Sequence, residues 1–266
     1  MARIIAVANQ KGGVGKTTTA INLAASLALA TRRVLLVDAD PQANTTSGVG
    51  LRGKSGVGGT IYDILTRGED VEDPDAFLVP TQVPGLVVVP ADRDLAGAEI
   101  ELVPMPQRES RLRRFLVRLR DRFDYIIIDC PPSLGLLTLN ALVAADAVVI
   151  PLHCEYFALE GLADLVATLR RVRANLNPDL DIEGVLLTMY DERTNLGQQV
   201  IREVREFFKD KVFHTVIPRN VRLGEAPSHG LPVALYDGKS RGAAAYGALA
   251  REFQQRAEAE RLEPGD

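Results

Sequence analysis

The chain has 266 residues, of which 46% are hydrophobic and 25% are charged, with a formal net charge of −4. This length can bury a sizeable core and suits one α/β domain, so we expect a single domain over residues 1–266. The composition is typical of a soluble globular protein, and no uninterrupted apolar run approaches the roughly 20 residues that a membrane helix needs. The slight acidic excess argues against a protein that binds nucleic acid at all times, because such proteins usually carry an obvious basic excess.

The compartment is indicated by the start of the chain and by its cysteines. MARIIAVANQ enters an apolar strand at once and lacks the pattern of a secretory signal. Cys130 and Cys154 cannot form a disulfide framework and make no CxxC pair. We therefore expect a protein of the reduced cytoplasm.

Short apolar, β-branched runs alternate along the chain with longer helical patterns. The predicted strands are residues 3–8, 34–37, 86–89, 125–128, 147–151, 182–188 and 212–217. The predicted helices are residues 17–30, 110–122, 136–145, 159–176, 197–208 and 243–261. Because the strands are almost continuously apolar, we expect an α/β fold with a doubly wound, mostly parallel sheet and helices on both faces. Ligands of such folds bind beyond the carboxyl ends of the strands.

Two segments between these elements predict irregular structure. Residues 48–59 are rich in glycine and serine and indicate a mobile loop. Residues 68–84 contain three prolines and several acids, which favours an irregular excursion at the surface.

A glycine-rich loop lies between the first predicted strand and the first predicted helix. Its sequence, QKGGVGKTT at residues 10–18, lets the backbone curl so that successive amides point inward, and the helix start adds its positive dipole end. Lys16 is placed to reach the β- and γ-phosphates of ATP, and Thr17 to give its hydroxyl to Mg²⁺. The predicted ATP-binding loop consists of Lys11, Gly12, Gly13, Val14, Gly15, Lys16, Thr17 and Thr18.

Acidic residues follow two of the predicted strands. VLLVDADPQ, residues 34–42, places Asp38 and Asp40 just past a strand end, and YIIIDCPP, residues 125–132, ends its strand in Asp129. An apolar strand that ends in aspartate after a phosphate-binding loop is a Walker B pattern, in which Asp129 would hold Mg²⁺ through water. No histidine or glutamate beside these motifs has the place of a strong general base. Hydrolysis by positioning alone should therefore be slow, unless a partner or DNA improves the geometry.

The phosphate loop departs from the ordinary Walker A pattern, because Gln10 replaces the first glycine and Lys11 adds a second lysine. It resembles the deviant Walker A loop, KGGxGK[ST], of the ParA/MinD family. The resemblance extends over nearly the whole chain and is closest to the ParA/Soj-type chromosome-partitioning ATPases. It includes CPPSLGLLTLNAL at residues 130–142, EYFALEGLADL at 155–165 and IPRNVRLGEAPSHGLPV at 217–233.

The resemblance implies roles for residues at the nucleotide. Lys11 would cross to the partner's nucleotide in a homodimer that forms on ATP binding, and Lys11, Lys16 and Asp40 would be the catalytic residues. Asp40 would orient the attacking water or its metal-bound neighbours. The implied metal site consists of Thr17, Asp38, Asp40 and Asp129.

The resemblance also implies roles for the second half of the chain. Residues 155–161 would change shape with the nucleotide, and Pro218 and Asn220 would lie against the adenine. The DNA-binding surface would contain Arg193, Arg219 and Arg222. Charge alone favours a solvated face here, because residues 187–241 contain nine Lys and Arg against seven acids.

The function that the resemblance implies is an ATP-dependent dimerising switch for chromosome or plasmid partitioning. It would bind double-stranded DNA without sequence preference, hydrolyse ATP slowly and respond to a ParB-type partner. We expect it in the cytoplasm, associated with the nucleoid. Two alternatives stay open: a ParA-like ATPase that positions a protein cargo, and a division-site regulator without DNA binding.

Other members of the wider family are less well matched. The final residues, AREFQQRAEAERLEPGD, intersperse acids and offer little apolar face, unlike the membrane helix of MinD-like proteins, so we expect no membrane partner. Cys130 and Cys154 are expected to be buried small hydrophobes and not cluster ligands. The chain begins directly at its first strand, like the short chromosomal ParA proteins that lack a helix-turn-helix region. Most of the arginines of residues 108–122 are expected to face water on an outer helix.

Overall fold

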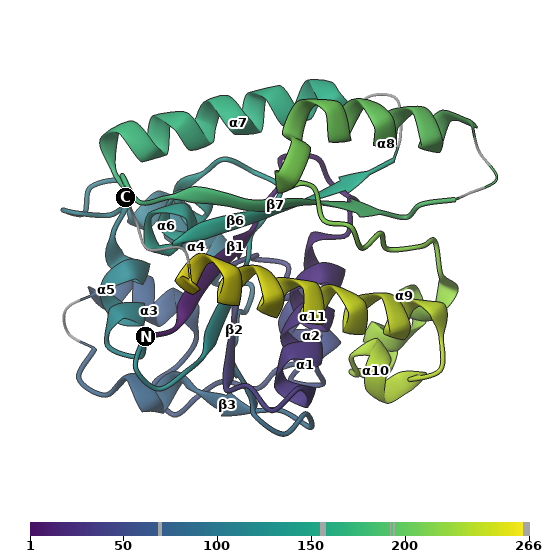
Figure 1. Ribbon diagram of the computed structural model, residues 1–266. Helices are drawn as coiled ribbons and strands as arrows, with labels where there is room; N and C mark the ends of the chain where they lie inside the picture. The colour runs from purple at the N-terminus through teal and green to yellow at the C-terminus, as the bar shows by residue number, and fades with distance from the viewer. Residues whose placement is uncertain (69–70, 155–157, 192, 194, 263–266) are drawn as a thin grey trace.

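A twisted central sheet organises the computed structural model, which describes residues 1–68, 71–154, 158–191, 193 and 195–262 (Figure 1). The seven strands lie in the order β3-β4-β2-β5-β1-β6-β7. They are β1 (Arg3–Val7), β2 (Val34–Asp38), β3 (Val79–Pro80), β4 (Leu86–Val89), β5 (Tyr125–Asp129), β6 (Ala147–His153) and β7 (Asp181–Thr188). Every neighbouring pair is parallel except β3 with β4. The predicted doubly wound, mostly parallel α/β fold is confirmed.

Helices cover both faces of the sheet, which explains why the central strands are apolar on both sides. The helices are α1 (Lys16–Leu29), α2 (Asn44–Gly48), α3 (Ile61–Arg67), α4 (Leu95–Glu101), α5 (Arg111–Val117), α6 (Leu136–Ala144), α7 (Ala158–Asn175), α8 (Asn195–Phe208), α9 (Val221–Glu225), α10 (Val233–Tyr236) and α11 (Arg241–Leu262). One hydrophobic cluster packs α3 to α8 on one face, and a second packs α1, α10 and α11 on the other. Figure 1 shows α7 and α8 above the sheet and α1 beside α11 below it.

The prediction of a strand at residues 212–217 is wrong. This segment runs along β7 but makes only isolated bridges, Val212 with Val185 and Pro218 with Tyr190. Between them the amides of His214 and Thr215 donate to the carboxylate of Glu252 on α11, at 2.7 and 2.8 Å. The amides of Phe213 and Ile217 still donate to β7, but the two consecutive amides between them both point to one carboxylate. A regular strand does not allow this, because its successive amides point in opposite directions.

Short elements between the main strands were not predicted. Residues 68–84 contain a 3₁₀ turn at Pro74–Phe77 and the two-residue antiparallel edge strand β3. Residues 48–59 are irregular after α2, yet Val49 and Leu51 within them are buried. The helix predicted at residues 110–122 ends at Val117. Beyond it the amides of residues 118–120 donate to carbonyls three residues back, and the Arg120 carbonyl accepts a hydrogen bond from the Ala2 amide at 2.7 Å.

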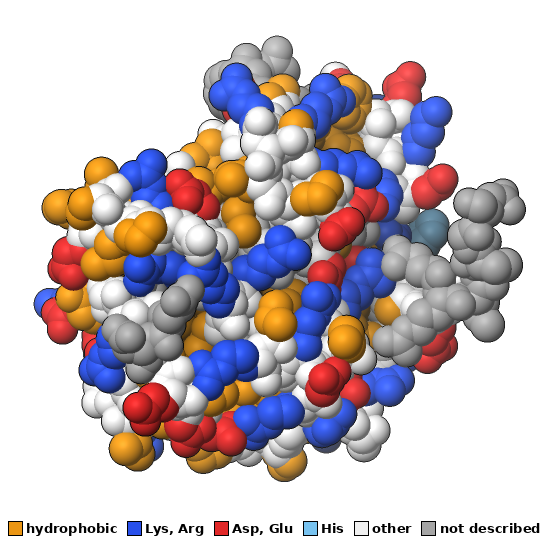
Figure 2. Space-filling model, turned by 90° about the vertical axis from the view of Figure 1, so that its left-hand side faces the viewer, with side chains coloured by type: hydrophobic (Ala, Val, Ile, Leu, Met, Phe, Trp, Pro, Cys, Tyr) orange, Lys and Arg blue, Asp and Glu red, His pale blue; other side chains and the backbone are white. Residues whose placement is uncertain are grey.

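The arginines of residues 108–122 do more than face water. Arg111 donates to two backbone carbonyls at the end of α3, at 2.8 and 3.0 Å. Arg118 donates to two carbonyls in the chain that follows α3, and Arg120 forms an ion pair with Asp146. Figure 2 shows that basic side chains on this side of the molecule are interspersed with acidic and apolar ones. These arginines therefore join α5 to neighbouring segments instead of forming one uniform basic patch.

None of the helices within the described ranges combines the length and apolar character that crossing a membrane requires.

Candidate nucleotide-binding site

The loop between β1 and α1 has the backbone shape that the glycines predict. Gly13 and Gly15 adopt left-handed conformations, with φ of 73° and 85°, which residues with a side chain rarely accept. Gly15 precedes the first turn of α1, and no side chain caps this helix start. The first amides of α1 are therefore available to an anion, and the helix dipole favours negative charge there.

Two side chains outside the predicted motif hold this loop in place. The Asn9 side chain accepts from the Lys11 amide at 3.0 Å and donates to the Pro151 carbonyl at the end of β6, at 2.8 Å. The Thr188 hydroxyl, at the end of β7, donates to the Val14 carbonyl at 2.9 Å. Sequence reasoning missed both residues. Asn9 could have been noticed as a polar residue directly after an apolar strand, whereas Thr188 meets the loop only through the tertiary fold.

Lys16 lies at the base of the loop. Its side-chain amine donates to the Lys11 carbonyl at 3.1 Å, and the residue is only 7% exposed. Burial lowers the pKa of this amine, and this effect exceeds the opposite one of the nearby Asp129 and Asp40 carboxylates, which raise the pKa. Lys16 is thus a desolvated cation beside the start of α1, where a phosphate chain would provide its counter-charge.

The predicted acids meet at the carboxyl ends of β2 and β5. Asp38 and Asp129 are register partners on these neighbouring strands, and both are fully buried. Burial raises the pKa of Asp38 to about 6. Burial, together with the charge of Asp38, raises the pKa of Asp129 to about 7. Asp40 is 8% exposed and accepts from the Gln42 amide at 2.9 Å.

The oxygen atoms of these acids differ in their hydrogen bonds. Both oxygens of Asp38 accept hydrogen bonds, Oδ2 from the amide and hydroxyl of Thr46 and Oδ1 from the Asp40 amide. Asp129 Oδ2 accepts from the Thr45 hydroxyl at 2.7 Å, but its buried Oδ1 has no hydrogen-bond partner among the described residues. A buried acceptor without a partner is costly unless a ligand satisfies it.

These residues fit a magnesium ion. Thr17 lies in the first turn of α1, and its hydroxyl is close enough to Asp129 to affect the pKa of that carboxyl. Within the described ranges, no group of three or more His, Cys, Asp or Glu side chains is arranged to hold a metal. Mg²⁺ does not need such a cage, because it usually keeps several waters and binds one or two protein oxygens together with phosphate.

A cavity of about 220 Å³ lies beside the start of α1. Gly15 and Thr18 of the loop line it, together with Pro218, Asn220 and Tyr246. The Asn220 side chain also accepts from the Arg222 amide at 2.9 Å and so caps α9. The structure therefore brings the predicted adenine-contacting residues, Pro218 and Asn220, next to the predicted phosphate loop.

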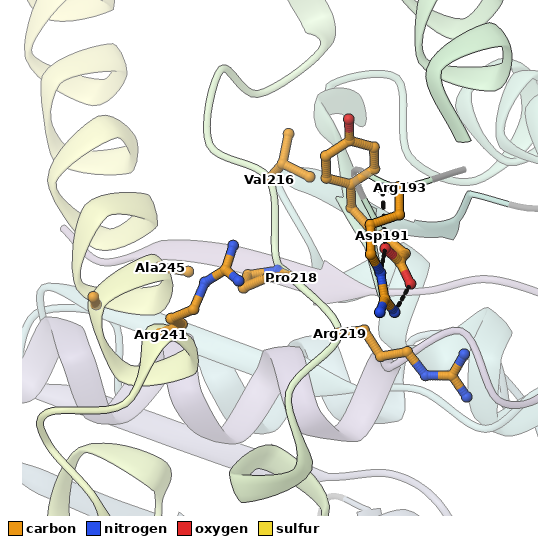
Figure 3. A pocket seen from close by; sticks show the side chains of 9 residues that line it. Asp191, Arg193, Val216, Pro218, Arg219, Arg241 and Ala245 are labelled. Carbon is orange, nitrogen blue, oxygen red and sulfur yellow. Dashed lines mark hydrogen bonds and ion pairs between the residues drawn. The ribbon is translucent and has the colours of Figure 1, made fainter. Parts of the chain in front are cut away.

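The three predicted DNA-binding arginines do not share one surface pocket. Arg193 and Arg219 line a cavity of about 590 Å³, together with Arg241 at the start of α11 (Figure 3). In Figure 3 Arg193 forms an ion pair with Asp191, and the Arg219 side chain extends away from that pair. Arg222 lies on α9, where ion pairs to Glu225 at 2.8 Å and Asp237 at 3.2 Å balance its charge. Arg241 was not among the predicted DNA-binding residues.

Two other expectations concern the cysteines and the segment after β6. Cys130 and Cys154 are buried, as predicted, and burial raises the pKa of both thiols, that of Cys154 to about 11. Of the segment predicted to respond to the nucleotide, residues 155–161, the first three lie outside the described residues.

The glycine loop after β1, the buried Lys16 and the aspartate at the end of β5 define a P-loop nucleotide-binding protein. Residues 2–182 match a family model described as an AAA domain. The chain belongs to the family of ParA/Soj-type partitioning ATPases, and its similarity to known members extends over almost its full length.

Several known proteins that are similar to the chain support this membership. It is 62% identical over 252 residues to the sporulation initiation inhibitor protein Soj of Bacillus subtilis, covering 95% of this chain and 98% of that protein. It is 58% identical over 254 residues to the chromosome partitioning protein ParA of Myxococcus xanthus, covering 96% of this chain and 88% of that protein. Among solved structures, cobyrinic acid a,c-diamide synthase from Mycobacterium smegmatis with a bound ATP analogue and magnesium has a TM-score of 0.83, at 40% identity and full coverage of both chains.

Proposed function

We propose that the protein is an ATP-driven molecular switch for DNA partitioning. It binds ATP with Mg²⁺, dimerises, binds double-stranded DNA without sequence preference, and hydrolyses ATP slowly until a ParB-type partner stimulates it. The observation that carries this proposal is the meeting of Lys16, Thr17 and the unpartnered Asp129 Oδ1 at the start of α1. It occurs in a chain 62% identical to Soj and 58% identical to ParA.

The nucleotide would lie with its phosphates on the loop and its base in the cavity beside α1. The amides of residues 12–18 and the Lys16 amine would hold the phosphates, and Pro218 and Asn220 would contact the adenine. Thr17 and Asp129 would hold the metal shell, and Asp38 would lie close to it. When bound, Mg²⁺ neutralises charge on the β- and γ-phosphate oxygens.

Hydrolysis and dimerisation would depend on residues at the rim of the loop. Lys11 is only partly buried and so could reach the nucleotide of a second subunit. Asp40 Oδ1 accepts a hydrogen bond from the Gln42 amide, and Asp40 Oδ2 would orient the attacking water. Catalysis by positioning, without a strong general base, is slow and suits a timer that a partner protein accelerates.

DNA binding would rest on the arginines that line the 590 Å³ cavity and on Arg222 of α9. Arg193 is 84% exposed at its side chain, and Arg219 and Arg241 line the same cavity. Because nearby acids balance part of this charge, one subunit provides few phosphate contacts, and a dimer would double them. This accounts for a DNA affinity that depends on ATP in a chain of net charge −4. We expect the protein in the cytoplasm, on the nucleoid.

We expect the double variant Arg193→Ala, Arg222→Ala to lose most of its DNA affinity in the ATP state. Removing two phosphate contacts from each subunit should reduce the slope of log affinity against log salt by about 4 per dimer. Fluorescence anisotropy with a random-sequence duplex at several salt concentrations measures this. Arg113→Ala, Arg171→Ala is the matched control, because it makes the same charge change at exposed positions on α5 and α7. Equal DNA binding by both double variants would reject the assigned DNA surface.

The name of the Mycobacterium smegmatis neighbour suggests a different activity, amide synthesis on a corrinoid acid. Release of ammonia from glutamine commonly uses a cysteine thiolate. Both cysteines of this chain are buried, with thiol pKa values raised by that burial, and neither suits such a nucleophile. Together with the higher identity to Soj and ParA, this favours the partitioning function. A ParA-like ATPase with a protein cargo and a division-site regulator are the alternatives that DNA-binding measurements separate.

A further inference from the structure

Two consecutive threonines at the start of α2 bind the two buried aspartates of the site. The hydroxyl of Thr45 donates to Asp129 Oδ2 at 2.7 Å, and that of Thr46 donates to Asp38 Oδ2 at 2.6 Å. Both threonines are buried, with exposed fractions of 0% and 1%. Ala43, with φ of 51°, makes the left-handed turn that directs α2 back over the ends of β2 and β5. No motif in the sequence assigns a function to either threonine.

The two hydrogen bonds have different consequences for the two acids. Thr46 also donates its amide to Asp38 at 2.8 Å, and its hydroxyl accepts from the Ala91 amide, just past β4, at 2.9 Å. Asp38 is therefore saturated and tied to the neighbouring strand end. Asp129 receives the Thr45 hydroxyl on one oxygen only, and its Oδ1 is left without a partner in the described part of the chain.

We propose that Thr45 is a positioning residue for Asp129, and that Thr46 with Asp38 is the anchor that holds α2 on the sheet. Thr45 occupies Oδ2, fixes the rotation of the carboxylate and leaves Oδ1 for the metal shell. This inference rests on the proposed binding of nucleotide and Mg²⁺. Hydrogen bonds of this kind to a metal-binding group typically change metal affinity by 10- to 100-fold when they are removed.

The same short segment also connects Asp129 to Asp40. The Ala43 amide donates to the Asp40 carbonyl at 2.9 Å, two residues before Thr45. The turn that presents Asp40 and the hydroxyl that orients Asp129 are thus parts of one hydrogen-bonded unit, residues 40–46. A shift of this unit would change the predicted water-orienting acid and the predicted metal-binding acid together.

The test is a titration of MgCl₂ into the full-length protein loaded with ADP, followed by calorimetry or by the melting temperature. We expect Thr45→Val to weaken Mg²⁺ binding at least about 10-fold, with ADP affinity in EDTA unchanged. Thr45→Ser keeps the hydroxyl and should restore Mg²⁺ affinity to within about twofold. Thr46→Val is the matched control: it should lower the melting temperature and leave the Mg²⁺ affinity of the folded protein within about twofold.

Several outcomes would overturn the assignment. Unchanged Mg²⁺ affinity in folded Thr45→Val, or an equal loss in Thr46→Val, means that Thr45 does not position Asp129. Thr45→Ala is measured beside Thr45→Val, and if neither folds, the hydroxyl is required for folding and the separate positioning role is rejected. Wild-type protein that binds no ADP, or whose ADP affinity ignores Mg²⁺, would instead reject the proposed nucleotide function itself.

Discussion

Replacing Lys16 by alanine should lower the affinity for ATP by at least about 30-fold, because truncating one partner of a desolvated charge pair typically costs 2–5 kcal/mol. Lys16 is 7% exposed and already lies within the phosphate loop, so its amine reaches bound phosphate without ordering a mobile side chain. Titration with a fluorescent ATP analogue measures the affinity directly. The melting temperature without nucleotide should change little, which separates lost binding from lost folding.

Lys11→Ala is the matched control for this experiment, since it removes the same charge from the same loop. Lys11 is only partly buried, and we assign it to the nucleotide of the other subunit. The Lys11 variant should keep monomer affinity for ADP and lose the dimer that ATP induces, as seen by light scattering. ATP affinity that survives in Lys16→Ala, or falls equally in both variants, contradicts these separate roles.

Asp129→Asn should stabilise the ligand-free protein at pH 8, and should stabilise it clearly less at pH 5. Burial and the neighbouring Asp38 raise the pKa of Asp129 from 3.8 to about 7. As the pH rises between these values, the carboxyl ionises in the unfolded chain but stays protonated in the fold, so the free energy of unfolding decreases. Below pH 4 the two states bind the same proton and this loss is absent. Asparagine cannot ionise and therefore removes the decline, which is worth a few kcal/mol for this shift.

Urea unfolding at pH 5, 6.5 and 8 without nucleotide measures this effect. Burial also raises the pKa of Asp38, to about 6. The free energy of unfolding therefore decreases with pH through Asp38 as well, and the Asp129 variant keeps this part of the decrease. Asp179→Asn, at an exposed position, is the control for the general loss of a carboxylate. A variant whose stability relative to wild type does not depend on pH would show that Asp129 is ionised in the ligand-free fold throughout this range.

The sequence predicted the parts of the fold that depend on local pattern. The apolar runs of β1, β2 and β5 are long enough to identify, and the residues of the phosphate loop are contiguous. β3 was missed because it has only two residues, one of them a proline. The error at residues 212–217 has a different cause, because Glu252 lies on a helix far along the chain and competes for the amides of that segment.

The sequence predicted the acids and the phosphate loop of the candidate site. It did not predict the residues that hold these groups in position. Thr45 is 84 residues from Asp129 in the sequence, so only the fold reveals their contact. Thr46 is eight residues from Asp38 and could have been suspected, but the pattern gives no reason to prefer it to Thr45. Arg241 lines the same cavity as Arg193 and Arg219 because α11 begins there. The sequence did not indicate this, because the charges of residues 187–241 are nearly balanced.

The central claim is that ATP switches DNA binding on, and one measurement tests it most directly. Binding to a random-sequence duplex is compared without nucleotide, with ADP and with ATP–Mg²⁺, at two salt concentrations, using Asp40→Ala to slow hydrolysis. We predict binding in the ATP state alone, falling steeply as salt increases. Equal binding in all three states, or no binding in any of them while ATP still induces dimers, would contradict DNA binding that ATP switches on.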